Sequence, residues 1–243
     1  MKRIIIILAA VALTMSCSKF PSGDTSGIKA VDLGLSVKWA DVNIGAKTPE
    51  AIGDYFAWGV TETYYTSVDP YTWKPDGKEG DETVVISWKE GFEAAGYFWS
   101  TYKWCTEDRT PTKYTGKDGK TVLDADDDAA AVKLGDGWRM PTREEMDELI
   151  TKCDCIWTER KGVHGLEVRS KAAGNNNSIF LPAGGGVWKT GNGIVDVQGL
   201  YWTSSFPNDK GTTAYRLLFS SSECNVTSGK NRPNGFPIRA VKK

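Results

Sequence analysis

The spacing of apolar positions predicts two kinds of element in this chain. Over residues 33–39 apolar side chains alternate with small or polar ones, which is the period of a half-buried strand. Over residues 146–153 they recur every three or four positions, which predicts a helix with one buried face. Thr142 before this helix and Glu145 three residues later form the capping-box pattern that fixes a helix N-terminus.

A second helix is expected upstream, where acidic residues begin a run that is rich in alanine. Four aspartates fall within residues 124–128, and the run continues to Leu134, just before Gly135. Acidic side chains favour the start of a helix because they oppose its partial positive charge, and glycine favours the end. We therefore expect a helix that begins in the acidic run and ends at Gly135.

The remaining chain is expected to form short strands joined by long loops. Glycine and asparagine separate short apolar runs, and the polar residues 106–121 predict an exposed loop. Few helices among many short strands predict an α+β fold with mixed or antiparallel sheets, in a single domain over residues 28–243. The expected strands are 83–88, 165–170, 178–182, 199–205, 214–221 and 236–241.

Residues 1–16 have the pattern of an export signal. Two basic residues precede ten apolar or small ones, a run too short to span a bilayer. The sequence L-T-M-S-C resembles the lipobox of bacterial lipoproteins, in its relaxed Bacteroidetes form. This implies cleavage before Cys17, acylation of Cys17 with a fatty acid such as palmitate, and a flexible tether over residues 17–27. The alternative is an ordinary signal peptide with a chance cysteine.

These features predict an outer-membrane lipoprotein. The tether has no acidic residue before Asp24, which favours the periplasmic face over the cell surface. The membrane is therefore an expected partner of this chain, through the lipid on Cys17.

Composition narrows the classes of function. The 30 basic and 31 acidic residues nearly cancel, so we expect no nucleic-acid partner. His164 is the single histidine, which excludes histidine-rich metal sites and makes any histidine-based catalysis depend on one residue. We expect no cofactor and no metal.

Four cysteines follow Cys17 in a chain that is expected to reach an oxidising compartment. Disulfides persist there, and four cysteines allow three complete pairings. Neighbours two residues apart do not pair easily, so the expected disulfides are long-range. A C-x-C spacing is also poor for zinc. The cysteines are Cys105, Cys153, Cys155 and Cys224.

Several motifs, taken in order, resemble one family. Residues 138–149, W-R-M-P-T-R-E-E-M-D-E-L, resemble the R-(L/M)-P-T-x-x-E motif of the formylglycine-generating-enzyme-like branch of the C-type lectin-like fold. Other blocks resemble the Fibrobacter succinogenes major paralogous domain, which is common in Bacteroidetes lipoproteins. These blocks are V-D-L-G-L-S-V-K-W-A (31–40), G-D-Y-F-A-W-G (53–59), S-I-F-L-P-A-G-G (178–185), Y-W-T-S-S (201–205) and G-F-P-I-R-A-V (235–241).

The resemblance implies a C-type lectin-like fold whose first and last strands pair. Arg139 and Arg239 lie in matched blocks beside apolar residues. We expect them to be structural and to pair with acids such as Asp127 or Asp128, because buried charges need partners. The tryptophans of the matched blocks are expected in the core, and they are Trp58, Trp138 and Trp202.

The resemblance also bears on the disulfides. Cysteines near Cys105 and Cys153 resemble recurring positions of the family, which implies a Cys105–Cys153 bridge. Cys155 and Cys224 are then a second pair or free.

Proteins of this fold commonly present variable loops on a rigid scaffold, and binding residues concentrate on such loops. We therefore expect a non-catalytic module that binds a glycan or a protein. Segments 188–192, 206–213 and 225–234 are rich in the small polar residues of adaptable binding loops. The predicted ligand-binding residues are Trp188, Asn192, Asn208, Asn225, Arg232 and Asn234.

Three alternatives complete the sequence-based interpretation. An envelope structural or assembly protein would differ from a binding module only in its ligand. A formylglycine-generating-like enzyme would need a close pair of reactive cysteines in the C-terminal part, where this chain has only Cys224, so no catalytic residue is expected. A calcium site at residues 124–128 lacks EF-hand spacing, and the start of a helix explains those acids more simply.

Overall fold

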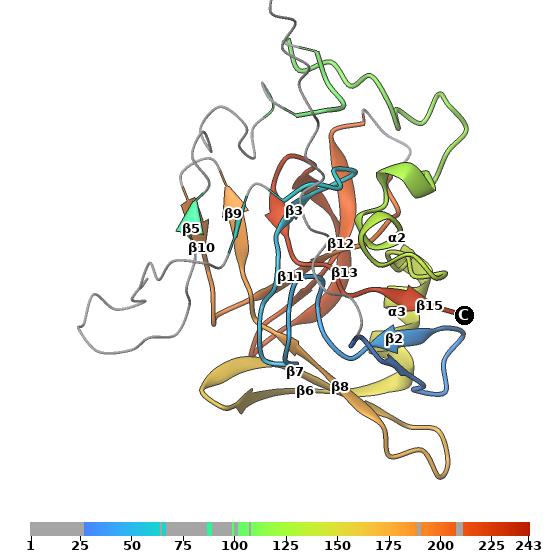
Figure 1. The fold of residues 1–243 in the computed structure, drawn as a ribbon, viewed down its shortest axis with the longest axis vertical. Helices are drawn as coiled ribbons and strands as arrows, with labels where there is room; N and C mark the ends of the chain where they lie inside the picture. The colour runs from blue at the N-terminus through green and yellow to red at the C-terminus, as the bar shows by residue number, and fades with distance from the viewer. Residues whose placement is uncertain are drawn as a thin grey trace, which may run out of the picture.

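The protein is α+β, as its sequence predicts, with small antiparallel sheets and two α-helices in the part of the chain that the structure describes (Figure 1). The structure is a computed structural model, and it describes residues 27–63, 65–66, 87–88, 99, 102–106, 108–188, 191–207 and 211–243. The lipidation site Cys17 lies outside these residues.

Helix α3 (Arg143–Lys152) confirms the predicted capping box. The Thr142 side chain accepts a hydrogen bond from the backbone N–H of Glu145, and the Glu145 carboxylate accepts one from the backbone N–H of Thr142 at 2.9 Å. Met146 and Leu149 are fully buried on the face that the spacing predicts. Local sequence thus determines where this helix begins and which face it buries.

The acidic run does not form one helix. It forms a single 3₁₀ turn, η2 (Ala125–Asp127), followed by α2 (Ala129–Leu134). Asp128 separates the two because its backbone is extended, and its carboxylate accepts hydrogen bonds from the N–H groups of Ala130 and Ala131. Asp128 therefore caps α2, and Gly135 ends it as predicted.

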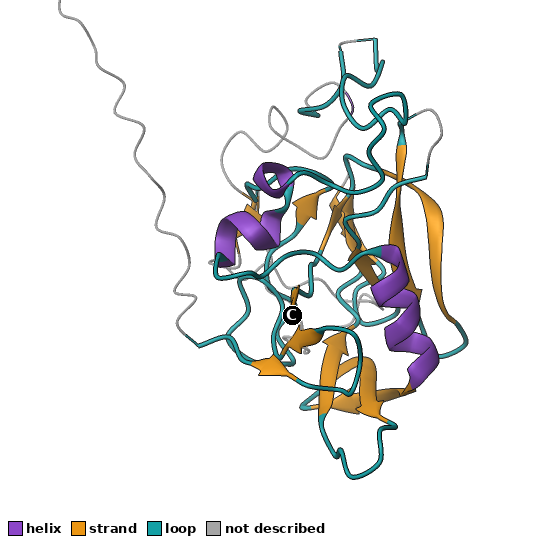
Figure 2. Ribbon diagram, turned by 90° about the vertical axis from the view of Figure 1, so that its right-hand side faces the viewer, coloured by secondary structure: helices purple, strands orange, loops and turns teal. Residues whose placement is uncertain are grey.

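The first and last strands share one sheet, which confirms the expected pairing. Strand β2 (Lys38–Ala40) lies between β1 (Ala30–Val31) and β15 (Val241–Lys242), with Trp39 opposite Val241. The two ends of the described chain therefore leave the fold from the same sheet. Figure 2 shows the C-terminus beside this small sheet.

The other strands form four further antiparallel sheets. The strand orders are β6-β7-β8, β11-β12-β13, β10-β9-β14-β3 and β4-β5. The strands are β3 (Phe56–Ala57), β4 (Tyr65–Thr66), β5 (Ser87–Trp88), β6 (Cys153–Arg160), β7 (Val163–Ser170), β8 (Ser178–Pro182), β9 (Gly186–Trp188), β10 (Gly191–Gly193), β11 (Gly199–Trp202), β12 (Thr213–Phe219), β13 (Cys224–Asn231) and β14 (Gly235–Phe236).

Three predictions about strands need correction. The alternating run 33–39 is a strand only from Lys38, because a bend precedes it with Gly34 at φ +74°. Residues 225–234, expected as a binding loop, lie largely in β13. Residues 236–241 are interrupted between β14 and β15, where Pro237 has no N–H to donate.

Sheet β11-β12-β13 separates the two largest groups of buried side chains. From β11, Leu200 and Trp202 face one group, which also holds Trp58 and Trp138. Tyr201 of β11 and Phe219 of β12 face the other. Because successive side chains of a strand point to opposite faces, a sheet between two cores buries every position of β11. The expected burial of Trp58, Trp138 and Trp202 is confirmed.

Arg239 joins three distant parts of the chain inside this core. Its Nε donates to the Asn43 side chain at 2.8 Å, and its Nη1 donates to the carbonyl oxygens of Ala40 and Asp41 at 3.0 and 3.1 Å. Its Nη2 donates to the carbonyl of Phe180 at 2.7 Å. Burial lowers the pKa of Arg239 to about 10, so the group stays charged at neutral pH.

The expectation of an acidic partner is wrong for Arg239 and confirmed for Arg139, although the acid at Arg139 is neither of the two named. Arg239 is held by backbone carbonyls and Asn43 rather than by an acid. Arg139 pairs through both Nη atoms with Glu145, at 2.7 Å for the Nη1–Oε2 contact, and not with Asp127 or Asp128. The carboxylate of the capping box therefore also neutralises this arginine.

We expect Arg239→Met to destabilise the protein by about 3 kcal/mol or more, because it leaves buried carbonyl oxygens without donors. Urea unfolding at pH 7 measures the change. Arg169→Met is the matched control: Arg169 is 55% exposed and contacts Glu167 at 2.9 Å, so its loss should destabilise the protein far less than the loss of Arg239. Equal effects of the two variants would contradict the structural role of Arg239.

Candidate functional site

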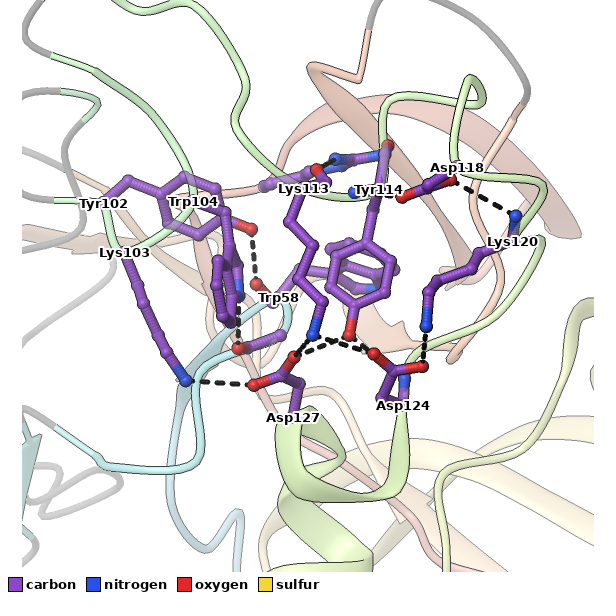
Figure 3. Close-up of polar contacts among 12 residues, drawn as sticks. Trp58, Tyr102, Lys103, Trp104, Lys113, Tyr114, Asp118, Lys120, Asp124 and Asp127 are labelled. Carbon is purple, nitrogen blue, oxygen red and sulfur yellow. Dashed lines mark hydrogen bonds and ion pairs between the residues drawn. The ribbon is translucent and has the colours of Figure 1, made fainter.

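Lysines and aspartates from three segments meet at one end of the fold, and we call Lys103, Lys113, Lys120, Asp124 and Asp127 the lysine–aspartate cluster (Figure 3). Lys113 lies 2.8 Å from Asp124 and 2.6 Å from Asp127. Lys103 contacts Asp127 at 3.0 Å, and Lys120 pairs with Asp124. The cluster therefore binds the segment around residues 102–120 to the start of η2.

Tyr114 connects this cluster to the hydrophobic core. Its ring is fully buried, and its hydroxyl donates to Asp127 at 2.6 Å and accepts from the backbone N–H of Asp124 at 3.1 Å. The ring packs edge-on against Trp58 and Trp104, with centroids 5.3 and 6.0 Å away. The prediction that 106–121 is an exposed loop is therefore wrong at Tyr114, which anchors the segment in the core.

Trp104 is covered by cations. The ammonium groups of Lys103 and Lys113 lie 4.3 and 4.8 Å from the centroid of its ring, within cation–π range. Its indole N–H donates to the carbonyl of Gly59 at 2.8 Å. Trp104 is thus fixed in position by both its ring face and its polar atom (Figure 3).

Arg232 also binds the segment around Tyr114. It is buried, so the prediction that it lies on a binding surface is wrong. Its guanidinium is fully buried and donates to the carbonyls of Thr213 and Tyr114, both at 2.9 Å. It also lies 4.5 Å from the ring centroid of Trp58. Asn234, also predicted to bind ligand, is buried as well. Both residues are buried because the turn between β13 and β14, which holds them, packs into the core.

The carboxylates of the cluster are already neutralised. Hydrogen bonds from Lys113 and Lys120 lower the pKa of Asp124 to about 2. Burial alone would raise the pKa of Asp127, but Lys113, Tyr114 and Lys103 together lower it. In the described chain no group of three histidine, cysteine or acidic side chains is arranged for a metal ion. Asp124 and Asp127 are therefore paired with lysines rather than with one another around a shared cation position.

The other predicted ligand-binding residues are scattered. Trp188 is half-buried in β9 and packs edge-on against Phe236 at 6.3 Å, and Asn192 lies in β10 opposite Val187. Asn225 is half-buried in β13, opposite Leu218. Asn208 lies outside the described residues. The structure therefore brings Trp188 and Asn192 together on one hairpin and leaves Asn225 on another sheet.

His164 forms a pair with Asp196. Its Nδ1 lies 2.9 Å from one carboxylate oxygen, and its backbone N–H donates to the other at 2.7 Å. The imidazole stacks on Trp157, and its Nε2 lies 3.8 Å from the carboxylate of Glu159. An oriented imidazole serves catalysis when its free nitrogen faces a nucleophile. Here that nitrogen faces the carboxylate of Glu159. The His164–Asp196 pair therefore serves as a structural contact between β7 and the turn at Asp196.

No family model, curated protein or solved structure matches the chain. Among the helices of the described residues, none is both long and apolar enough to span a membrane.

The structure brings together Cys155 and Cys224, the cysteines that the implied Cys105–Cys153 bridge leaves as a second pair or free. The Cys155 thiol on β6 hydrogen-bonds to the sulfur of Cys224 on β13, which raises the pKa of Cys155 and lowers that of Cys224. Cys105 instead donates to the carbonyl of Trp99 at 2.7 Å, while Cys153 is buried in the other core group. All four are free thiols in this structure, and the expected Cys105–Cys153 bridge does not fit it.

Sequence analysis missed the residues that hold the 102–120 segment. Lys113 lies in a polar run and Lys103 stands between two aromatic residues. Their shared acidic partner Asp127 is reached only through the tertiary fold. One local signal was available. A tyrosine within an otherwise polar stretch, as Tyr114 is, indicates an anchor point because an aromatic side chain favours burial.

We expect Asp127→Asn to lower the free energy of unfolding by about 2–4 kcal/mol at pH 7, because it leaves two lysines and the Tyr114 hydroxyl without their charged partner. Asp126→Asn is the matched control, since Asp126 is exposed one residue away. Folding lowers the pKa of Asp127 below its ordinary 3.8. Its contribution is therefore full above about pH 4 and is lost as the pH falls further.

Urea unfolding of both variants between pH 2 and pH 7 measures this effect. The gap between wild type and Asp127→Asn should narrow on acidification. A gap that stays constant with pH would show that the charge of Asp127 contributes nothing.

We expect oxidised glutathione to join Cys155 to Cys224. The two thiols lose two protons and two electrons, and glutathione disulfide is reduced to two thiols. Non-reducing peptide mass mapping should recover the Cys155–Cys224 peptide, with a stability gain of roughly 2–4 kcal/mol. Cys155→Ser should abolish the crosslink and Cys105→Ser should leave it. Recovery of Cys155 or Cys224 in a bridge to another cysteine, or of both as free thiols, would refute the assignment.

Proposed function

We propose that this protein is a lipid-anchored, non-catalytic ligand-binding module of the cell envelope, with a C-type lectin-like fold and an anchor at Cys17. The export signal and lipobox-like sequence support the anchor. Two helices, small antiparallel sheets and the pairing of β2 with β15 are in keeping with the proposed fold.

The observation that carries the binding function is the way in which a long irregular segment is held rigid. Residues 102–106 and 108–124 contain no regular strand or helix. Segments of this length without secondary structure are uncommon in compact domains and are usually functional. Tyr114, Arg232 and the lysine–aspartate cluster fix this one at several points. A preformed loop surface favours binding because less ordering entropy is lost when a ligand arrives.

The position of this segment suits a tethered receptor. Figure 1 shows the green chain of the 102–120 region at the top of the molecule, while β2 and β15 lie lower down. The tether enters through β1, in the sheet that also holds β2 and β15. A lipid anchor at the N-terminus would therefore leave the loops of the opposite end free to meet a ligand.

The described chemistry favours binding over catalysis. The His164–Asp196 pair has a carboxylate at its free nitrogen. The hydrogen bond between Cys155 and Cys224 raises the pKa of Cys155, which keeps that thiol protonated and a poor nucleophile. An envelope assembly protein is the alternative, and it differs from the proposal in having a protein as its ligand.

A thermal-shift screen of the full chain in mild detergent tests the proposal. The panel holds neutral and acidic glycans, each with calcium or with a chelator. A glycan at about 100 times its dissociation constant should add about 2.7 kcal/mol, a shift of several degrees. The shift should not depend on calcium, because lysines neutralise Asp124 and Asp127.

Two results would contradict the proposal. A flat panel, together with crosslinking to one envelope protein, would favour the assembly role. Oxidation of a cysteine-containing peptide by the pure protein would favour the enzyme.

A further inference from the structure

One buried arginine differs from the two that support the fold. Arg216 on β12 is 6% exposed, yet its Nε has no hydrogen-bond partner. Its only hydrogen bond in the described chain is a long one, from Nη1 to the carbonyl of Ser228 at 3.5 Å. No acidic side chain of the described residues lies within ion-pair distance of it. A buried guanidinium in this condition is costly, because desolvated charges need partners.

A second cation stands beside Arg216. Lys230 on β13 lies opposite Ala214, and Arg216 lies opposite Thr227, so both cations belong to one end of the β12–β13 pair. Burial and the charge of Arg216 lower the pKa of Lys230, and burial lowers that of Arg216. Glu223 is the one acid that acts on Arg216, and it does so only at a distance. Two partly buried cations thus lie at neighbouring positions of the β12–β13 pair, and neither has an acid within ion-pair distance in the described chain.

The backbone beside Arg216 is irregular, as is common next to binding sites. The register between β12 and β13 shifts between Ala214 and Arg216. Such irregularities redirect a side chain and are frequent beside binding sites. Arg216 is thereby held between Trp202 on β11 and Thr227 on β13.

We infer that Arg216 and Lys230 form an anion subsite that binds the carboxylate of an acidic sugar. Guanidinium groups bind carboxylates through paired N–H donors, the buried Nε–H of Arg216 has no partner in the described chain, and Lys230 supplies a second charge. The inference deepens the proposed function, and its choice of a sugar rests on that function.

The test uses the full chain in mild detergent with glucuronate and N-acetylneuraminate as acidic probes. Glucose and sodium acetate separate the contributions of the ring and of the carboxylate, and a polyglutamate peptide supplies a protein-like carboxylate. Calorimetry and thermal shift should show that the acidic sugars bind at least tenfold more tightly than glucose or acetate. Their affinity should fall as salt rises, because the contact is ionic.

The variants Arg216→Gln and Lys230→Gln should each weaken acidic-sugar binding at least tenfold. Arg169→Gln, an exposed arginine on β7, should leave it unchanged. If Arg216→Gln does not fold, Lys230→Gln still decides the question, because Lys230 makes no hydrogen bond or ion pair within the described chain.

The outcomes separate this inference from the proposed function. If neutral glycans bind and acidic ones gain nothing from Arg216 or Lys230, the subsite is wrong while the binding function stands. If no glycan binds, both are wrong. If only polyglutamate binds through Arg216, the sugar assignment is wrong and the protein-binding alternative gains support.

Discussion

The fold depends on a buried positive charge that backbone oxygens, rather than an acid, hold in place. Arg239 draws together the end of β2, the strand β8 and the approach to β15, all of which are far apart in sequence. Asn43 extends this network, since its amide donates to the carbonyl of Ile52 and to the hydroxyl of Tyr201, which donates to Pro182. Carbonyl partners at fixed points of the main chain specify backbone geometry, which a mobile acidic side chain cannot do as well.

Backbone carbonyl oxygens also hold a second buried arginine, Arg232, but they do not satisfy a third one, Arg216. Arg232 also donates to backbone carbonyls, and it fixes the 110–114 segment as Arg239 fixes the central sheet. Arg216 is nearly as buried, but its Nε has no such partner. Carbonyl oxygens thus satisfy the donors of Arg239 and Arg232, which we regard as structural. The donors of Arg216 are not all satisfied, and this is why we propose it as a binding residue.

The sequence predicts those features of the fold that depend on residues close together along the chain. The capping box of Thr142 and Glu145 and the strand 178–182 follow from local patterns and agree with the structure. Strand β6 was missed because it follows α3 directly, without a turn signal. The partners of Arg239 and Asp127 could not be predicted, since they are backbone oxygens and lysines that only the tertiary fold brings close. The small polar side chains of β13 suit both a loop and a strand, so their pattern predicts a loop where the fold forms a strand.

The lysine–aspartate cluster and the Arg216–Lys230 pair differ in whether their charges have partners of opposite sign. In the lysine–aspartate cluster each carboxylate already has a lysine, so that surface is rigid but electrostatically occupied. At Arg216 and Lys230 the chain has placed two cations without an acid in contact. A rigid, self-neutralised loop provides shape, while an uncompensated cation provides selectivity for charge. The proposed binding function would use both, and in this fold they come from different elements, the loop 102–124 and the β12–β13 pair.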